Sequence, residues 1–167
     1  MEKRLYLLAE LDADSQREFK DFEHIFADHH ITGSQTKGIP YHITLSVYPA
    51  DMEEYLENLL DNIQREFAEI EITYGSLGLF GLRVLFANPG MNIKLVELYD
   101  TVKAHSINER DDLSAHTTLL IDTPENILSI LPEVSGNFGK INSRITHISL
   151  YEFFPERFIK RIPLKQK

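Results

Sequence analysis

Two short stretches of the sequence repeat one arrangement of proton-transferring and hydrogen-bonding side chains. Each places a histidine two residues before a threonine inside an apolar run, His42 and Thr44 in "HITL" and His116 and Thr118 in "HTTL". Residues two apart in a β-strand point to the same face. Each stretch therefore predicts a strand that presents an imidazole and a hydroxyl side by side. The intervening and following residues should be buried on the opposite face: Ile43, Leu45, Val47, Thr117, Leu119 and Ile121.

Two imidazoles and two hydroxyls suit a reaction on a small anion. Histidine gives or accepts a proton near neutral pH. One neutral imidazole can take a proton from an attacking water or hydroxyl, while a protonated one donates to a leaving oxygen. Threonine hydroxyls can hydrogen-bond to the non-bridging oxygens of a phosphate. If the two strands face each other across a cleft, the pattern fits cleavage of a phosphodiester.

Metal ligation is the rival chemistry for a histidine pair. A zinc site needs a third protein ligand, and neither motif has one at helical or short-loop spacing. Asp122 follows His116 by six residues, at the expected end of the strand. The sequence has no glycine-rich phosphate loop, and the glycines of "GSLGLFG" predict a bulged or bent strand. We expect no metal and no cofactor.

The other five histidines are predicted to lie outside this site. His147 begins a third match, "HISL", but it falls on the last strand of its half of the chain, where its counterpart is Tyr74 and not His42. We therefore predict a structural or peripheral role for His147. The remaining four lie on expected helices or close one, where imidazoles favour the negative end of the helix dipole: His24, His29, His30 and His105.

The order strand, helix, strand, helix, strand is expected twice along the chain. Apolar runs and helical periodicity predict strands at 4–11, 41–48, 70–81, 83–90, 114–122 and 144–154, helices at 12–30, 50–67, 92–106 and 123–134, and a further candidate strand at 157–164. The two motif strands occupy matching places in this order. We expect a single domain over 1–167, built from pseudo-repeat lobes at about 4–81 and 82–155.

Composition limits the classes of partner. The chain has 167 residues, 43% of them hydrophobic, no cysteine and a net charge of −9. Without cysteine there are no disulfides and no thiolate chemistry, which fits a cytoplasmic protein, and no apolar run or leader-like start predicts a membrane span or a signal peptide. Proteins that grip long nucleic acids need a basic face, so the charge argues against long RNA or DNA. It leaves a nucleotide or an RNA end possible.

The paired motifs resemble those of the 2H phosphoesterase superfamily, the group that includes the bacterial 2′-5′ RNA ligase-like proteins. The resemblance also rests on "GSLGLFGLRVLFANP" between the motifs, and it covers most of the chain. It implies a bilobal α+β fold, with an antiparallel sheet and outer helices in each lobe and a central cleft. It also implies metal-independent chemistry on 2′,3′-cyclic phosphates or 2′-5′ linkages, with His42 and His116 catalytic and Thr44 and Thr118 binding phosphate.

Substrate contacts and partners are less defined by the sequence. Tyr41, Lys37 and Arg83 lie near the motifs in sequence, and Tyr151 lies on the last predicted strand of the repeat; we retain all four as candidate substrate contacts. The expected partner is a small nucleotide cyclic phosphate or an RNA end, with no long nucleic acid, no membrane, and a monomeric chain. An alternative is a binding module with the same cleft and no turnover, and a structural protein with a degenerate site is a third. Two complete motifs favour the enzyme, because binding does not need two proton-transfer groups.

Overall fold

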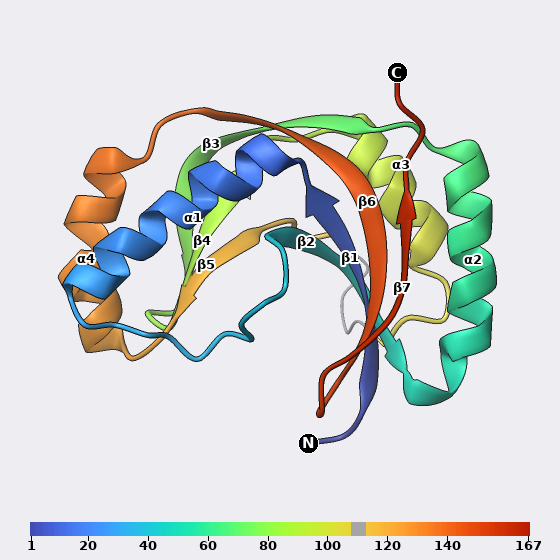
Figure 1. The fold of residues 1–167 in the computed structure, drawn as a ribbon, viewed down its shortest axis with the longest axis horizontal. Helices are drawn as coiled ribbons and strands as arrows, with labels where there is room; N and C mark the ends of the chain where they lie inside the picture. Colours follow the sequence, from blue (N-terminus) through green and yellow to red (C-terminus); the bar gives the residue numbers. More distant parts are fainter. Residues whose placement is uncertain (108–112) are drawn as a thin grey trace.

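The chain folds into one antiparallel sheet with helices on its outer side (Figure 1). The structure is a computed structural model that describes residues 1–107 and 113–167. Its elements, in chain order, are β1 (Arg4–Leu11), α1 (Ala13–Asp28), β2 (His42–Pro49), the 3-10 turn η1 (Ala50–Met52), α2 (Glu53–Glu66), β3 (Ile70–Phe80), β4 (Val84–Pro89), α3 (Ile93–Val102), β5 (Thr117–Ile121), α4 (Pro124–Asn137), β6 (Ile141–Phe153) and β7 (Arg157–Pro163). The predicted α+β class and the order of elements are confirmed.

The sheet consists of two halves that share the long strand β6. The strand order is β2-β1-β6-β3-β4-β5, and β7 also pairs with β6. We call β2, β1, the later part of β6 and β7 the first sheet half, and β5, β4 and β3 the second sheet half. The start of β6 pairs with β3, and its later part pairs with β1 and β7. The two sheet halves are therefore continuous.

The last strand of each predicted repeat lies in the sheet half of the other repeat. β3 closes the first repeat in sequence but pairs with β4 of the second, and β6 closes the second repeat but pairs with β1 of the first. The repeat boundaries at 4–81 and 82–155 stay a prediction about the sequence. In space, the strands of the two segments are interleaved.

A bulge follows the threonine of each motif. The pairing of β2 with β1 skips Leu45, and the pairing of β5 with β4 skips Leu119, so the two extra residues occupy the same place in their motifs. A bulge shifts the alternation of faces by one residue. As a result Tyr48 is buried in the core, whereas Val47 and Ile121 are half-buried. The prediction that Val47 and Ile121 are buried behind the motifs was wrong for this reason.

The register across the motif strands makes β1 and β4 equivalent. Thr44 lies opposite Leu8 of β1, and Thr118 lies opposite Phe86 of β4. Both Leu8 and Phe86 are buried but lie outside the main core cluster, on the face that carries the motif side chains. We call this face of the sheet the motif face.

The same register gives His147 a different counterpart from the one predicted. On the first sheet half His147 of β6 lies opposite Glu10 of β1. On the second sheet half Ser76 of β3 lies opposite Asn88, the equivalent of Glu10. The counterpart of His147 is therefore Ser76. The assignment to Tyr74 was wrong by two residues, because Tyr74 lies opposite Pro89 and so matches Ile145, which lies opposite Leu11.

Helix ends follow the expected capping chemistry. Asp12 caps α1 and accepts a 2.8 Å hydrogen bond from the backbone N–H of Ser15, and Thr123 caps α4 directly before Pro124. In Figure 1, α1 and α4 lie beside the second sheet half, and α2 and α3 lie beside the first. Both pairs bury apolar side chains against the sheet.

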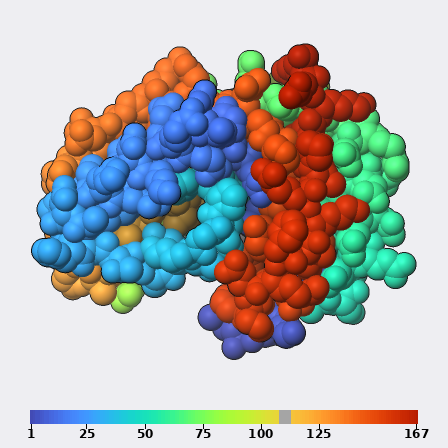
Figure 2. All heavy atoms as spheres, viewed as in Figure 1, coloured from blue at the N-terminus to red at the C-terminus, as the bar shows by residue number. Residues whose placement is uncertain are grey.

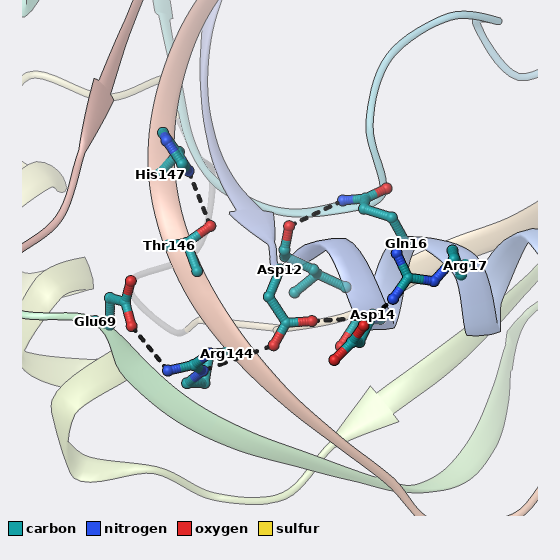
Figure 3. A network of polar contacts seen from close by, with 10 residues as sticks. Asp12, Asp14, Gln16, Arg17, Glu69, Arg144, Thr146 and His147 are labelled. Carbon is teal, nitrogen blue, oxygen red and sulfur yellow. Dashed lines mark hydrogen bonds and ion pairs between the residues drawn. The ribbon is translucent and has the colours of Figure 1, made fainter. Parts of the chain in front are cut away.

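A small polar network ties the start of α1 to the junction of the sheet halves (Figure 3). The guanidinium of Arg144 on β6 lies 3.1 Å from the Glu69 carboxylate and 3.8 Å from that of Asp12. The backbone N–H of Asp12 donates to the Arg144 carbonyl at 2.9 Å. These contacts fix the end of β1 against β6, where β3 takes over as the neighbour of β6.

The helices of residues 1–107 and 113–167 include none with both the length and the apolar character that crossing a bilayer requires. The cytoplasmic location and the monomeric state expected from the sequence stay predictions.

Candidate functional site

The two motif histidines are held in the same way by the backbone. Nδ1 of His42 lies 2.8 Å from the carbonyl oxygen of Pro40, and Nδ1 of His116 lies 2.7 Å from that of Ser114. A carbonyl oxygen can only accept, so Nδ1 of each ring carries the proton. In the neutral rings Nε2 is then the unprotonated nitrogen. Each imidazole can therefore take up or release a proton at Nε2.

A buried hydroxyl joins the two motif strands. The Thr117 hydroxyl donates to the carbonyl of His42 at 3.0 Å and lies 2.6 Å from the phenol oxygen of Tyr74, which donates to it. Thr117 is fully buried. The sheet thus curves until its two edge strands, β2 and β5, meet at the motifs. The sequence predicted that Thr117 is buried but missed this role; the signal was a hydroxyl where an aliphatic side chain would be expected.

A cavity of about 480 Å³ opens beside the motifs, and three of the four predicted motif residues line it: His42, Thr44 and Thr118. Its other walls come from α1, the loop that follows α1, strands β1 and β5, and the end of β6. Figure 2 shows the surface hollowed between α1 and this loop. His116 is not among the lining residues. It is nevertheless close enough to His42 for its charge to lower the pKa of His42. The motif residues and this cavity together form the candidate site.

Two of the four candidate substrate contacts line the cavity. The Tyr41 hydroxyl donates to the Glu23 carboxylate at 2.7 Å, and burial, followed by this bond, raises the pKa of Tyr41 well above its ordinary value. The Lys37 ammonium donates to the carbonyl of Thr32 at 2.5 Å. Tyr41 therefore stays a neutral phenol. Lys37 is the positively charged side chain that this cavity wall offers to an anionic ligand.

The other two candidate contacts lie elsewhere. Arg83 is in the turn between β3 and β4, where its backbone N–H donates to the Phe80 carbonyl. Tyr151 is buried on the motif face of β6, with its ring 5.9 Å from that of Phe153 and 5.5 Å from that of Phe158. Neither is among the described residues that line the cavity, so the cavity gives no support to either as a substrate contact.

A buried carboxylate beside His42 was missed by the sequence analysis. Glu10 lies opposite His42 on one side and opposite His147 on the other, and its side chain is 2% exposed. Its carboxylate accepts a 2.7 Å hydrogen bond from the guanidinium of Arg161 on β7. The acid inside the apolar run "RLYLLAEL" was the available signal. A charged residue in a strand of this kind is rarely fully buried unless it is paired.

Burial dominates the electrostatics of His42. Desolvation lowers the pKa of His42 below its ordinary value, and the charge of His116 lowers it further. The hydrogen bond to Pro40 and the charge of Glu10 act in the opposite direction. The net direction is downward, so His42 is neutral at pH 7, and Glu10 limits the size of the effect.

His116 has aromatic neighbours instead of a carboxylate. Its ring lies 4.8 Å from the Phe80 ring, edge to face, and 5.3 Å from the Phe86 ring. The two phenyl rings lie 4.3 Å apart. Phe86 also covers Gly78 so closely that a Cβ at residue 78 would come within 2.4 Å of the ring. The glycine therefore allows the phenyl cluster to form beside His116.

The remaining histidines have other surroundings. Figure 3 shows His147 with Nδ1 directed at the hydroxyl of Thr146, 2.9 Å away. Burial, then the charge of Arg161, lowers the pKa of His147. His147 is not among the lining residues. His29 contacts Glu133 at 2.8 Å and so links α1 to α4.

Residues 1–107 and 113–167 contain no group of three or more His, Cys, Asp or Glu side chains placed to hold a metal ion. Asp122, the nearest acid to the second motif in sequence, accepts hydrogen bonds from the backbone of Thr123 and from Asn126, which lower the pKa of its carboxyl. It therefore belongs to the start of α4. Metal independence stays a prediction for experiment.

Solved structures share this fold over nearly the whole chain. No family model matches the chain, and no curated protein matches it. The structure of a phosphoesterase aligns with a TM-score of 0.66 at 19% identity over 98% of this chain and 99% of its own. LigT of E. coli aligns with a TM-score of 0.65 at 22% identity over 98% of both chains, and TT0787 of Thermus thermophilus with 0.67 at 13% over 98% and 99%. The chain therefore has the fold of these proteins, which confirms the fold expected from the resemblance to the 2H phosphoesterases.

Proposed function

We propose that this chain is a metal-independent phosphodiesterase. Its substrate is a 2′,3′-cyclic phosphate or a 2′-5′ phosphodiester of a small nucleotide or an RNA end. His42 and His116 act as the acid–base pair, and Thr44 and Thr118 bind the phosphate. The carrying observation is the matched geometry of the motifs, with each Nδ1 bonded to the carbonyl two residues before it and the strands joined by Thr117.

The proposed reaction is an in-line displacement at phosphorus. For hydrolysis of a cyclic phosphate, one neutral imidazole accepts a proton at Nε2 from water as the water oxygen bonds to phosphorus. The other imidazole, protonated, donates its Nε2 proton to the leaving 2′ or 3′ oxygen as that P–O bond breaks. The threonine hydroxyls donate to the non-bridging oxygens, where charge develops. After the step the first imidazole is protonated and the second is neutral. Proton transfer through solvent then restores the starting state.

The surroundings of the two imidazoles favour one division of labour. Burial keeps His42 neutral at pH 7, the form that a general base requires. We therefore assign the base to His42 and the acid to His116. Glu10, beside His42, would stabilise the imidazolium that forms when His42 takes the proton.

The solved structures support this choice of ligand. LigT of E. coli, at about a fifth sequence identity, has been crystallised with phosphate and with 3′-AMP. Of these ligands, 3′-AMP joins a phosphate to a ribonucleoside, as the product of cyclic phosphate hydrolysis would. A cavity of about 480 Å³ is within the size range of small-molecule sites.

The proposal is tested by a substrate screen in the presence of EDTA. The substrates are a nucleoside 2′,3′-cyclic phosphate, ADP-ribose cyclic phosphate, a 2′-5′ oligoadenylate and an RNA carrying a cyclic phosphate end. Turnover of at least one, lost in the double variant His42→Ala/His116→Ala, is the expected result. Turnover that requires added zinc or manganese would contradict the proposed acid–base chemistry. Binding of nucleotides without any turnover would favour the alternative, a binding module with the same cleft.

A further inference from the structure

Three aromatic side chains form one wall of the cavity next to the motif residues. Tyr6 of β1, Phe153 of β6 and Phe154 beyond it all line the cavity, and we call them the aromatic wall. The rings of Tyr6 and Phe153 lie 4.9 Å apart, edge to face, and those of Phe153 and Phe154 lie 6.3 Å apart. Phe154 is 42% exposed and has a φ of 72°, which a bulky side chain rarely adopts. An exposed aromatic group held in this way offers a flat surface to a ligand.

The register of β1 sets the distance between the aromatic wall and the motif residues. Leu8 lies opposite Thr44, and Tyr6 is two residues further along the same face of β1. At about 3.3 Å per residue, the Tyr6 backbone lies roughly 6.6 Å beyond the point opposite Thr44. A phosphate bound at Thr44 would therefore have space for a sugar before the aromatic wall is reached.

The second sheet half carries a different set of side chains at the place that matches the aromatic wall. The counterpart of Tyr6 there is Val84, because Phe86 matches Leu8. The phenyl rings of Phe80 and Phe86 pack on each other and against His116. Neither of these phenyl groups is among the residues that line the cavity, whereas the three side chains of the aromatic wall are.

We propose that the aromatic wall binds the nucleobase of the substrate, on the side of the first sheet half. This inference rests on the proposed function and narrows it: the substrate is a nucleoside phosphate whose base lies beside the scissile phosphate, not a base-free sugar phosphate. Stacking on aromatic side chains accepts every base, because each has a π face. The wall therefore selects for the presence of a base and discriminates weakly among bases.

Kinetics on two substrates test the inference. Replacing a stacking aromatic by alanine typically weakens binding roughly 5- to 150-fold. Tyr6→Ala should lower kcat/KM for adenosine 2′,3′-cyclic phosphate by a factor in that range, mainly through KM, and should lower it far less for glycerol 1,2-cyclic phosphate, which has no base. Tyr6→Phe should retain the wild-type preference. Phe158→Ala is the matched control, because Phe158 belongs to the same aromatic group, is 55% exposed and lies outside the cavity lining.

A binding measurement separates failure of this inference from failure of the proposed function. Calorimetry compares adenosine 3′-monophosphate with inorganic phosphate, and needs no turnover. The wild type should bind the nucleotide more tightly, and Tyr6→Ala and Phe154→Ala should reduce that advantage; Phe154, being exposed, can be replaced without opening the core. If the ratio of the affinity for the nucleotide to the affinity for phosphate is unchanged in both variants, the inference is overturned even if the enzyme turns over. A reduced ratio in a protein without turnover would support it and reject the proposed function.

Discussion

The two sheet halves have the same backbone plan around different side chains. In each, an imidazole at the start of the motif strand is bonded to the carbonyl two residues before it, and a bulge follows the threonine. The neighbour of the motif strand carries buried Glu10 in the first half and exposed Asn88 in the second. Beside the motif threonine, Leu8 in the first half is replaced by Phe86 in the second.

This difference shows how a nearly symmetric frame can serve an asymmetric reaction. The shared features fix the positions of the Nε2 atoms, which both proton transfers require. The differing features set the charge environment of His42, through Glu10, and place the aromatic wall on the first sheet half. Phosphodiester hydrolysis needs the shared and the differing features, because one imidazole takes up a proton while the other releases one.

Removal of either motif imidazole should have the largest effect. His42→Ala and His116→Ala should each lower the rate of cyclic phosphate hydrolysis by about a hundred- to ten-thousand-fold, as loss of general acid–base catalysis typically does. The double variant should be scarcely slower than either single variant, because the pair acts as one unit. His147→Ala is the control and should stay near the wild-type rate. Loss of turnover in His147→Ala with His116→Ala still active would mean that the catalytic pair has been assigned wrongly.

Thr117→Val tests the link between the two sheet halves. The substitution keeps the shape but removes the hydrogen bond to the His42 carbonyl and leaves the Tyr74 hydroxyl buried without its partner. A buried polar group left unpaired costs about 1–3 kcal/mol, so the free energy of unfolding, measured with urea, should fall by that amount, and turnover should fall with it. Tyr74→Phe removes the orphaned hydroxyl itself and should cost less. Equal stability of Thr117→Val and the wild type would show that the link does not hold the motifs together.

The motif threonines should contribute less than the histidines. Thr44→Ala and Thr118→Ala each remove one neutral hydrogen bond to the phosphate, worth about 0.5–1.5 kcal/mol and somewhat more toward developing charge. We expect kcat/KM to fall roughly 2- to 20-fold in each case. Serine at either position should restore most of the rate, since it keeps the hydroxyl. A loss as large as that of the histidine variants would show that these hydroxyls do more than bind oxygen.

Glu10→Gln should have a small effect, visible in the pH profile. The charge of Glu10 raises the pKa of His42 against the larger effect of burial. Without that charge the folded-state pKa of His42 should fall further, so the acidic limb of kcat/KM should move to lower pH. Asn88→Ala, at the equivalent place beside the other motif, should leave that limb where it is. An acidic limb that moves to higher pH in Glu10→Gln would contradict the described environment of His42.

Local pattern was enough to predict the motif strands, the helices, and the shared face of His42 and Thr44, which both line the cavity. It was insufficient where the structure depends on how neighbouring strands pair. The bulges at Leu45 and Leu119 depend on the neighbouring strand, so the faces of Val47 and Ile121 were predicted wrongly. The Glu10 to Arg161 contact joins residues 151 positions apart. The local spacing of apolar residues does not encode contacts between residues that are far apart in the sequence.

The exchange of β3 and β6 between the repeats was also beyond the sequence pattern. Each strand has the same apolar character whichever sheet half it joins, and the choice is made by long-range pairing. For the same reason the counterpart of His147 was assigned two residues out of register. The cavity wall at Tyr6 and Phe153 depends on this exchange, because β6 brings Phe153 beside β1.

A pH–rate profile of three proteins in EDTA tests the assignment of base and acid. The proteins are the wild type, His42→Ala and His116→Ala, each measured on one nucleoside 2′,3′-cyclic phosphate that the wild type hydrolyses. The wild type should give a bell-shaped kcat/KM, with its acidic limb below the ordinary histidine pKa of about 6.5. The residual rate of His42→Ala should lose the acidic limb, and that of His116→Ala the basic limb. A reversed loss of limbs would exchange the two roles, and a wild-type rate that is flat with pH or abolished by EDTA would contradict paired-histidine catalysis in this protein.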